Sequence, residues 1–169
     1  IKRKGVQAIK LVEGDSLANV VLMNDEDIMI FTKRGMSILF KSKTISPLGR
    51  VAKGVKGIKL NEGDEVAAGV AAKQKGFIYL ITKSGSGKAM DRNLFTPQGR
   101  GGKGVFCLPY KSDAEVAGVF FSESQNNNIL LIGIPNSIYI KENEIPLTAR
   151  TAGGNILIKG SQVLSAIEV

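Results

Sequence analysis

Three arginines spaced 50 residues apart are the side chains whose type and spacing point most directly to chemistry. Arg50, Arg100 and Arg150 each lie in a glycine-containing segment, and Lys53 and Lys103 follow the first two after three residues. Arginine and lysine offer charge and hydrogen bonds to phosphate oxygens. Neighbouring glycines let backbone N–H groups approach a phosphate closely. The pattern therefore predicts phosphate binding at one place in each of three successive units.

The overall charge of the chain agrees with a polyanionic partner. Its 169 residues include 23 Lys and Arg against 15 Asp and Glu, a net charge of +8, which favours nucleic acid. No base-reading aromatic or Asn/Gln pair recurs beside the arginines, so we expect binding to the phosphates of double-stranded DNA with little sequence preference. Two alternatives are a basic surface that serves solubility and a propeller-type protein-interaction scaffold with incidental charge. The predicted DNA-binding residues are Lys33, Arg34, Lys41, Lys43, Arg50, Lys53, Lys56, Lys59, Lys83, Lys88, Arg92, Arg100, Lys103 and Arg150.

Other chemistry has little support in the sequence. The chain has no histidine, which removes the commonest general base and metal ligand. Cys107 is its only cysteine and has apolar neighbours, so we expect a buried, inert thiol and no disulfide or paired-cysteine metal site. The segment "SGSGKA" (84–89) departs from a phosphate-binding P-loop, and Tyr79 and Tyr139 fit strand packing. We predict no catalytic residue, no metal site and no cofactor.

The expected setting is a reducing cytoplasm. There is no disulfide framework, and no apolar run approaches the roughly 18 residues that a membrane span needs. The chain opens at Ile1 without a methionine or a signal-like segment, and we expect it to be part of a longer protein.

The elements that position the arginines come from an internal repeat. Residues 28–71 align without a gap with residues 78–121, and a third, drifted copy begins near Ile129. Residues 4–21 match 53–70, the tail of a further unit. We therefore predict one repeat domain over 1–169, with a partial blade at 1–25 and blades at 26–75, 76–126 and 127–169.

Within each unit the hydrophobic period is two, which predicts strands and an all-β fold. In the first whole unit, "DIMIFTK" and "MSILFK" form one predicted hairpin, and "VKGIKL" (55–60) and "EVAAGVA" (65–71) a second, joined by a turn at Gly63. The arginine-bearing segment between them should be an exposed loop. About four strands in roughly 50 residues is typical of a propeller blade, which must stack on its neighbours to bury its faces.

Charge declines along the chain from unit to unit. Residues 27–73 hold nine basic and four acidic residues, residues 77–123 hold six and four, and residues 129–169 hold three of each. We expect the first whole unit to hold DNA most tightly and the last most weakly.

The tandem segments "GRVAKGVKGIKLNEGDEV" (49–66) and "GRGGKGV" (99–105) resemble the C-terminal blades of the A subunits of bacterial type IIA DNA topoisomerases, gyrase A or its topoisomerase IV counterpart. The resemblance implies a β-pinwheel, in which blades exchange strands and DNA bends around the rim. It implies that this domain presents a DNA segment to a catalytic core located elsewhere. It also implies an A-subunit dimer and a B-type ATPase subunit as partners, with ATP and magnesium bound outside this domain. The setting that it implies is the bacterial cytoplasm, in association with the nucleoid.

The gyrase A family carries a seven-residue box, Q-R-R-G-G-K-G, in its first blade. Residues 98–104 differ from that box only at Gly99. Because they lie in a late unit, they are not taken as the functional box, which is expected upstream of Ile1. The later "RGGKG" favours gyrase over topoisomerase IV.

Overall fold

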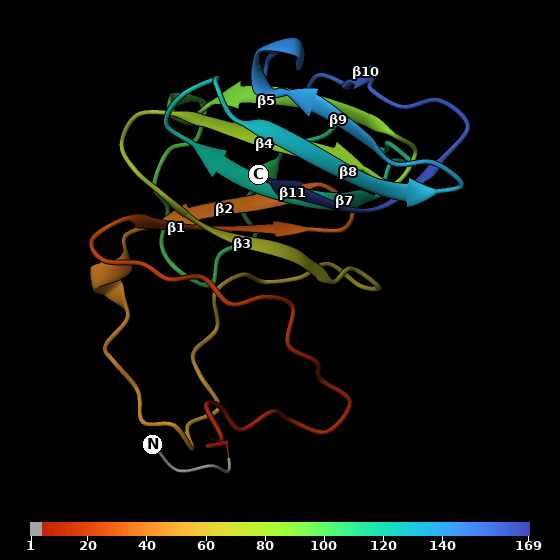
Figure 1. The fold of residues 1–169 in the computed structure, drawn as a ribbon. Helices are drawn as coiled ribbons and strands as arrows, with labels where there is room; N and C mark the ends of the chain where they lie inside the picture. The colour runs from red at the N-terminus through yellow and green to blue at the C-terminus, as the bar shows by residue number, and fades with distance from the viewer. Residues whose placement is uncertain (1–4) are drawn as a thin grey trace.

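The computed structural model describes residues 5–169 and confirms an all-β protein (Figure 1). Within that range no helix has the length and apolar character needed to cross a membrane. The three helical segments are single 3-10 turns: η1 (Ser42–Thr44), η2 (Arg92–Leu94) and η3 (Glu142–Glu144). The strands are β1 (Asp27–Thr32), β2 (Met36–Phe40), β3 (Val66–Ala72), β4 (Phe77–Thr82), β5 (Ser86–Asp91), β6 (Val105–Phe106), β7 (Val116–Ser122), β8 (Asn128–Ile134), β9 (Ile138–Lys141), β10 (Asn155–Ile156) and β11 (Gln162–Glu168).

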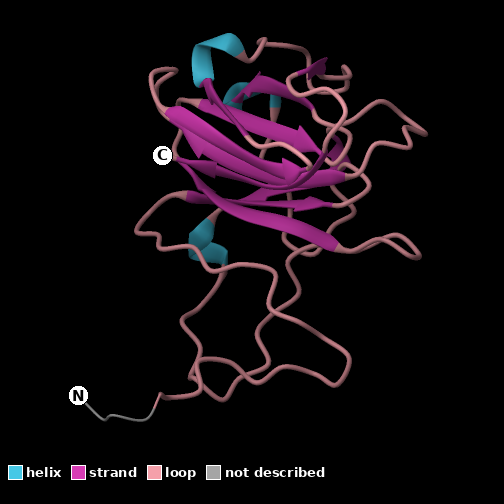
Figure 2. Ribbon diagram, turned by 45° about the vertical axis from the view of Figure 1, so that its right-hand side comes forward, coloured by secondary structure: helices cyan, strands magenta, loops and turns pink. Residues whose placement is uncertain are grey.

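The strands form three antiparallel sheets that lie on one another as layers (Figures 1 and 2). The first has the order β3-β1-β2-β6, the second β10-β5-β4-β7 and the third β11-β8-β9. Each is built on a hairpin, β1–β2, β4–β5 or β8–β9, as the period-two pattern predicts. The third strand of each sheet arrives from the far end of the same unit and pairs with the first strand of the hairpin.

The second predicted hairpin is wrong, because the strand after the arginine segment joins the preceding sheet. β6 of the second unit pairs with β2, and β10 of the third pairs with β5. Gly104 makes this approach possible: it has φ +78°, and a Cβ there would lie 2.2 Å from the carbonyl oxygen of Ser37. Residues 55–60 form no strand. The exchange of strands between units agrees with the resemblance to a pinwheel.

Apolar side chains fill the spaces between the sheets. One core lies between the first two sheets and includes Phe31, Ile78 and Leu80; another joins the second and third and includes Tyr79 and Ile81. Successive residues of β4 thus enter opposite cores, as expected of a strand buried on both faces. β3 packs on β7, and β7 on β11.

A buried ion pair also fastens the first sheet to the second. The Arg92 guanidinium, at the start of η2, lies 2.8 Å from a carboxylate oxygen of Asp27 at the start of β1. Both side chains are almost completely buried. The same oxygen accepts hydrogen bonds from Lys41 and Gln74. Such a pair holds the layers in register, because without Asp27 the buried Arg92 guanidinium would have no carboxylate partner.

Residues 5–26 contain no strand and extend, with the 45–60 segment, beyond the stack of sheets (Figures 1 and 2). Asn19 attaches this stretch to β3, donating a hydrogen bond to the carbonyl oxygen of Gly69 and accepting one from its N–H. A second contact runs from the N–H of Lys10 to the carbonyl oxygen of Ala52.

Candidate nucleic-acid interface

Three arginine loops, defined as residues 47–54, 97–104 and 147–154, follow the hairpins of the three units. Each comes after a 3-10 turn and leads toward the segment that pairs, in the second and third units, with the preceding sheet. Arg50, Lys53, Arg100 and Lys103 are exposed, and Arg150 is half-buried. The exposed loop that the sequence predicts around Pro47 and Gly49 is confirmed.

Backbone hydrogen bonds anchor the second and third arginine loops along the edge of the sheet that precedes each of them. The N–H of Gln98 donates to the carbonyl oxygen of Leu39 in β2 at 2.7 Å. At the same repeat position in the next unit, the N–H of Thr148 donates to the carbonyl oxygen of Ala89 in β5 at 2.9 Å. Identical anchoring of successive loops places their basic side chains at equivalent points of stacked sheets.

Two of the arginines make the same contact with the unit before them. Arg100 Nη1 donates to the carbonyl oxygen of Lys56 at 2.8 Å, 44 residues earlier. Arg150 Nη1 donates to the carbonyl oxygen of Phe106, also 44 residues earlier. One nitrogen of each guanidinium is thereby held, and a guanidinium has further N–H donors for a phosphate. The sequence analysis missed these backbone acceptors, since carbonyl groups carry no signature in residue type.

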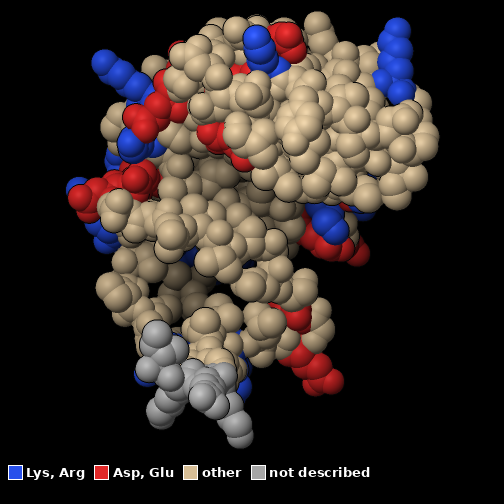
Figure 3. All heavy atoms as spheres, viewed as in Figure 1, with Lys and Arg blue, Asp and Glu red and all other residues tan. Residues whose placement is uncertain are grey.

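The loops differ from the rest of the surface in their lack of acidic residues. Residues 47–59, 97–105 and 147–159 contain no Asp or Glu. Of the ion pairs within residues 5–169, none includes a basic residue of an arginine loop. Elsewhere, the face seen in Figure 3 intersperses basic and acidic side chains. Positive charge without an internal partner is what a phosphate-binding surface requires.

Lys88 and Arg92 lie inside the fold, which corrects their prediction as direct DNA contacts. Lys88 is completely buried in β5 and Arg92 is 4% exposed. The Lys88 ammonium donates to the carbonyl oxygens of Arg150 and Ala152, and Arg92 pairs with Asp27. Both side chains are therefore bound within the protein, and their burial leaves a phosphate no access to them.

Three other lysines that were predicted to contact DNA form ion pairs with acidic residues of the protein. Lys33 pairs with Glu65 at 2.6 Å and Lys83 with Glu115 at 2.5 Å, again in repeat register, and Lys41 pairs with Asp27. The Glu65 carboxylate raises the pKa of Lys33 above its ordinary value. Because a local carboxylate competes with phosphate, these lysines are weaker candidates.

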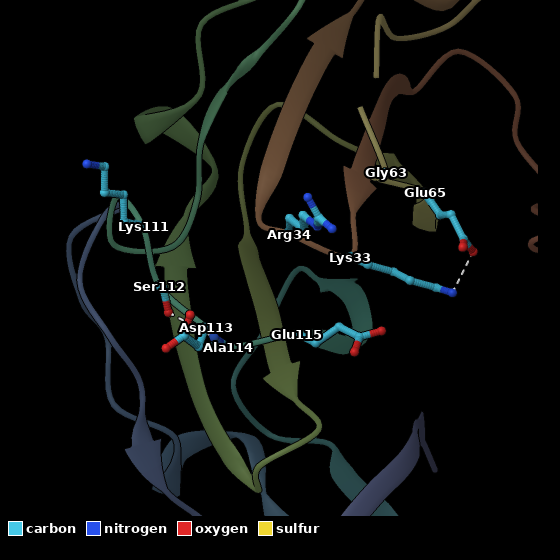
Figure 4. A pocket seen from close by; sticks show the side chains of 9 residues that line it. All are labelled: Lys33, Arg34, Gly63, Glu65, Lys111, Ser112, Asp113, Ala114 and Glu115. Atoms are coloured by element: carbon cyan, nitrogen blue, oxygen red, sulfur yellow. Dashed lines mark hydrogen bonds and ion pairs between the residues drawn. The ribbon is translucent and has the colours of Figure 1, made fainter. Parts of the chain in front are cut away.

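Lys33 and Arg34 line a hollow of about 630 Å³ with mixed charge (Figure 4). It lies between the β1–β2 turn, the turn at Gly63 and the loop 111–115. In Figure 4, Lys33 reaches toward Glu65, and Arg34 lies between the acidic side chains. Three basic and three acidic side chains line the hollow, so it lacks the net positive charge of a phosphate site.

The remaining predicted residues, Arg34, Lys43, Lys56 and Lys59, are exposed. Lys56 and Lys59 continue the acid-free stretch that begins with the first arginine loop. Their side chains therefore extend the candidate surface along the chain.

Two of the three side chains that the sequence predicts to be structural, those of Cys107 and Tyr79, are buried. Cys107 is completely buried, and burial raises the pKa of its thiol to about 12. Tyr79 is also buried, stacked on Phe120 at 4.9 Å between ring centres, and burial raises its pKa to about 12. Gly14 and Gly63 have positive φ in their "EGD" turns. Tyr139 is the exception, being mostly exposed on β9.

Comparison with known proteins decides the family. The family described as "DNA gyrase C-terminal domain, beta-propeller" matches residues 1–22, 26–72, 76–123 and 136–161. The chain belongs to this family.

Gyrase A subunits match this gyrase-type domain over nearly its whole length. That of Buchnera aphidicola is 31% identical over 163 residues, which cover 95% of this chain and 19% of the relative. That of Helicobacter pylori strain 26695 is 33% identical over 159 residues, 91% of this chain and again 19% of the relative. The chain thus spans about a fifth of the length of the curated relatives it matches.

The fold of this gyrase-type domain also resembles a solved topoisomerase IV structure. The crystal structure of the C-terminal domain of DNA topoisomerase IV superposes with a TM-score of 0.89 and 25% identity. The match covers 96% of this chain and 52% of that one. The resemblance to the topoisomerase A-subunit blades inferred from the sequence is confirmed.

Proposed function

We propose that this chain binds double-stranded DNA through the exposed basic residues of the arginine loops and bends it along the edges of the stacked sheets. The observation that carries the proposal is the acid-free, unpaired positive charge that recurs at one place in each unit. The residues proposed to contact phosphates are Arg50, Lys53, Arg100, Lys103 and Arg150 in the loops, with Lys43, Lys56 and Lys59 beside the first loop.

Bending follows from where the charges lie. The second and third loops are anchored to the edges of the first and second sheets, and the sheets lie on one another. A duplex that contacts several loops has to follow the line of these edges. The bending energy of the duplex, a few kcal/mol for a short site, is offset by the added phosphate contacts.

Within a whole protein, we propose that this domain wraps a DNA segment and presents it to a catalytic core for an ATP-dependent change of topology. The domain would take no catalytic step and bind no cofactor itself, with ATP and magnesium held elsewhere. An A-subunit dimer and a B-type ATPase subunit would be its partners in the bacterial cytoplasm, at the nucleoid. Support comes from the match to gyrase A subunits, of which this chain covers about a fifth.

The test compares the chain with its Arg50→Gln/Lys53→Gln variant in binding a linear duplex of about 150 base pairs at several salt concentrations. Each lost phosphate contact should lower the salt slope by about one, so we expect a slope smaller by up to about two and weaker binding at low salt. The matched control is Lys73→Gln/Lys75→Gln, which removes two exposed charges outside the loops.

Equal weakening in both variants would overturn the loop assignment, because it would indicate a response to net charge alone. Absence of binding by the unaltered chain at low salt would overturn the DNA proposal and favour a protein-interaction scaffold. Relaxed circles treated with topoisomerase I in the presence of the chain test wrapping separately. A shift in linking number is expected if the bent duplex is wrapped.

A further inference from the structure

The second and third arginine loops are fastened in different ways. In the second, the carbonyl oxygen of Gly102 accepts a hydrogen bond from the backbone N–H of Lys59 at 2.8 Å. The N–H of Gly101 also donates to the carbonyl oxygen of Gly57 at 2.7 Å. Main-chain groups of the neighbouring unit therefore hold the turn that carries Arg100.

The third loop has no equivalent main-chain donor, because Pro109 occupies the repeat position of Lys59. Proline has no N–H, so the carbonyl oxygen of Ala152, which corresponds to that of Gly102, cannot be satisfied in the same way. A carbonyl oxygen that is withdrawn from water and has no donor destabilises the folded loop. Because proline stands at position 109, the carbonyl oxygen of Ala152 requires a donor from another part of the fold.

Lys88 supplies that donor from inside the second sheet. Its Nζ lies 2.6 Å from the carbonyl oxygen of Ala152 and 2.7 Å from that of Arg150. The side chain is completely buried, and this burial lowers the pKa of the amine to about 8. In either protonation state the amine has at least two N–H groups, enough for both carbonyls.

The other units indicate that this lysine is specific to the third loop. The repeat positions of Lys88 hold Ile38 and Ile138. Ile38 lies beneath the second loop, since a Cβ on Gly102 would be 3.6 Å from its Cδ1. An apolar residue suffices there because Lys59 provides the hydrogen bond to Gly102.

We propose that Lys88 is a positioning residue that holds the Arg150 turn in its DNA-binding conformation and replaces the main-chain donor lost at Pro109. This inference rests on the proposed function for its DNA part, and on the two hydrogen bonds to the turn for its structural part. Lys88 touches no DNA. It orients Arg150, whose guanidinium also donates to the carbonyl oxygen of Phe106.

The first experiment needs no DNA. Hydrogen exchange of the amides in 148–157 is compared among the unaltered chain, Lys88→Ile and the Lys88→Ile/Pro109→Ala variant. Isoleucine is the residue of the other two units, and the Pro109→Ala change restores an N–H at the repeat position of Lys59. We expect exchange to rise at least tenfold in Lys88→Ile and to return toward the original rate in the double variant, with 98–104 unchanged.

The second experiment measures affinity for a duplex of about 150 base pairs. Lys88→Ile should weaken binding by about as much as Arg150→Gln does, and should add nothing in an Arg150→Gln background. The Pro109→Ala change should restore the affinity lost in Lys88→Ile. Rescue by a neutral residue separates positioning from loss of charge.

The outcomes distinguish the two proposals. Unchanged exchange in Lys88→Ile overturns the role of Lys88 in fastening the turn. Faster exchange with undiminished affinity overturns its role in presenting Arg150 to DNA, if Arg150→Gln does weaken binding. If Arg150→Gln also leaves affinity unchanged, the proposed DNA contact fails at this loop and the fastening of the turn stands. Should Lys88→Ile fail to fold, Lys88→Met provides the same loss of donors with a flexible side chain.

Discussion

The interior of the second sheet and the arginine loops contain the same kinds of residue in opposite roles. Lys88 and Arg92 are buried and donate to carbonyl oxygens or a carboxylate, whereas Arg50, Lys53, Arg100 and Lys103 are exposed and have no ionic partner within residues 5–169. Residue type and net charge are therefore insufficient to define a DNA-binding surface. The comparison indicates that exposure together with the absence of an acidic partner distinguishes a candidate phosphate contact from a structural cation.

The largest effect should come from breaking the buried pair between the first two sheets. Arg92→Met leaves the Asp27 carboxylate, 3% exposed, with Lys41 as its remaining cationic partner, and removing one partner of a buried pair costs up to about 3–5 kcal/mol. Urea denaturation followed by circular dichroism measures the loss in unfolding free energy. Lys43→Met, an exposed lysine of η1, is the matched control and should change it by less than about 0.5 kcal/mol. Equal effects of the two variants would contradict the assigned difference.

A smaller effect is expected from the titration of Lys88. Burial lowers its folded-state pKa from 10.5 to about 8, so between these pH values the unfolded chain keeps a proton that the folded chain has lost. The unfolding free energy therefore rises with pH across this window, by about 3 kcal/mol in total, and below about pH 8 the contribution is constant.

Cys107 and Tyr79 act in the opposite direction above about pH 9, because their folded-state pKa values are raised to about 12. The contribution of Lys88 is therefore taken as the difference between the unaltered chain and Lys88→Ile at each pH from about 7 to about 10. A difference that stays constant over this range would show that Lys88 does not titrate as a buried amine. Both chains contain the same Cys107 and Tyr79, so their titration cancels in the comparison.

The hairpins could be predicted from the sequence because they depend on local period-two patterning and glycine turns. The partners of the strands after the second and third arginine loops could not be predicted, since β6 and β10 contain only two residues each and their sequences do not select a sheet edge. Gly104 is required because the backbone approaches Ser37 closely at this point. This requirement can be recognised only when the positions of the two sheets are known. The exchange of strands between units could be predicted only from the family resemblance.

The same limit applies to the candidate site. The loop cations were found through their 50-residue spacing, and their exposure follows from the surrounding Pro and Gly residues. The burial of Lys88 and Arg92 depends on partners 62 and 65 residues away, respectively, in other parts of the fold. Sequence spacing within one unit carries no information about such contacts. The proline at position 109 was the one local clue that a nearby carbonyl needed a new donor.

The smallest effect should come from the exposed ion pairs. Their lysines resemble the loop cations in exposure and resemble Arg92 in having an acidic partner. Lys83 and Glu115 lie 2.5 Å apart with side chains 39% and 40% exposed. Exposed pairs contribute about 0–1 kcal/mol, so Lys83→Gln should lower the unfolding free energy by less than about 1 kcal/mol. Because Glu115 already neutralises this lysine, the same change should leave the salt slope of DNA binding unaltered. Glu115→Gln removes the acidic partner of Lys83. A modest rise in DNA affinity in that variant alone would indicate that the Glu115 carboxylate, rather than the location of Lys83, keeps this lysine from binding DNA.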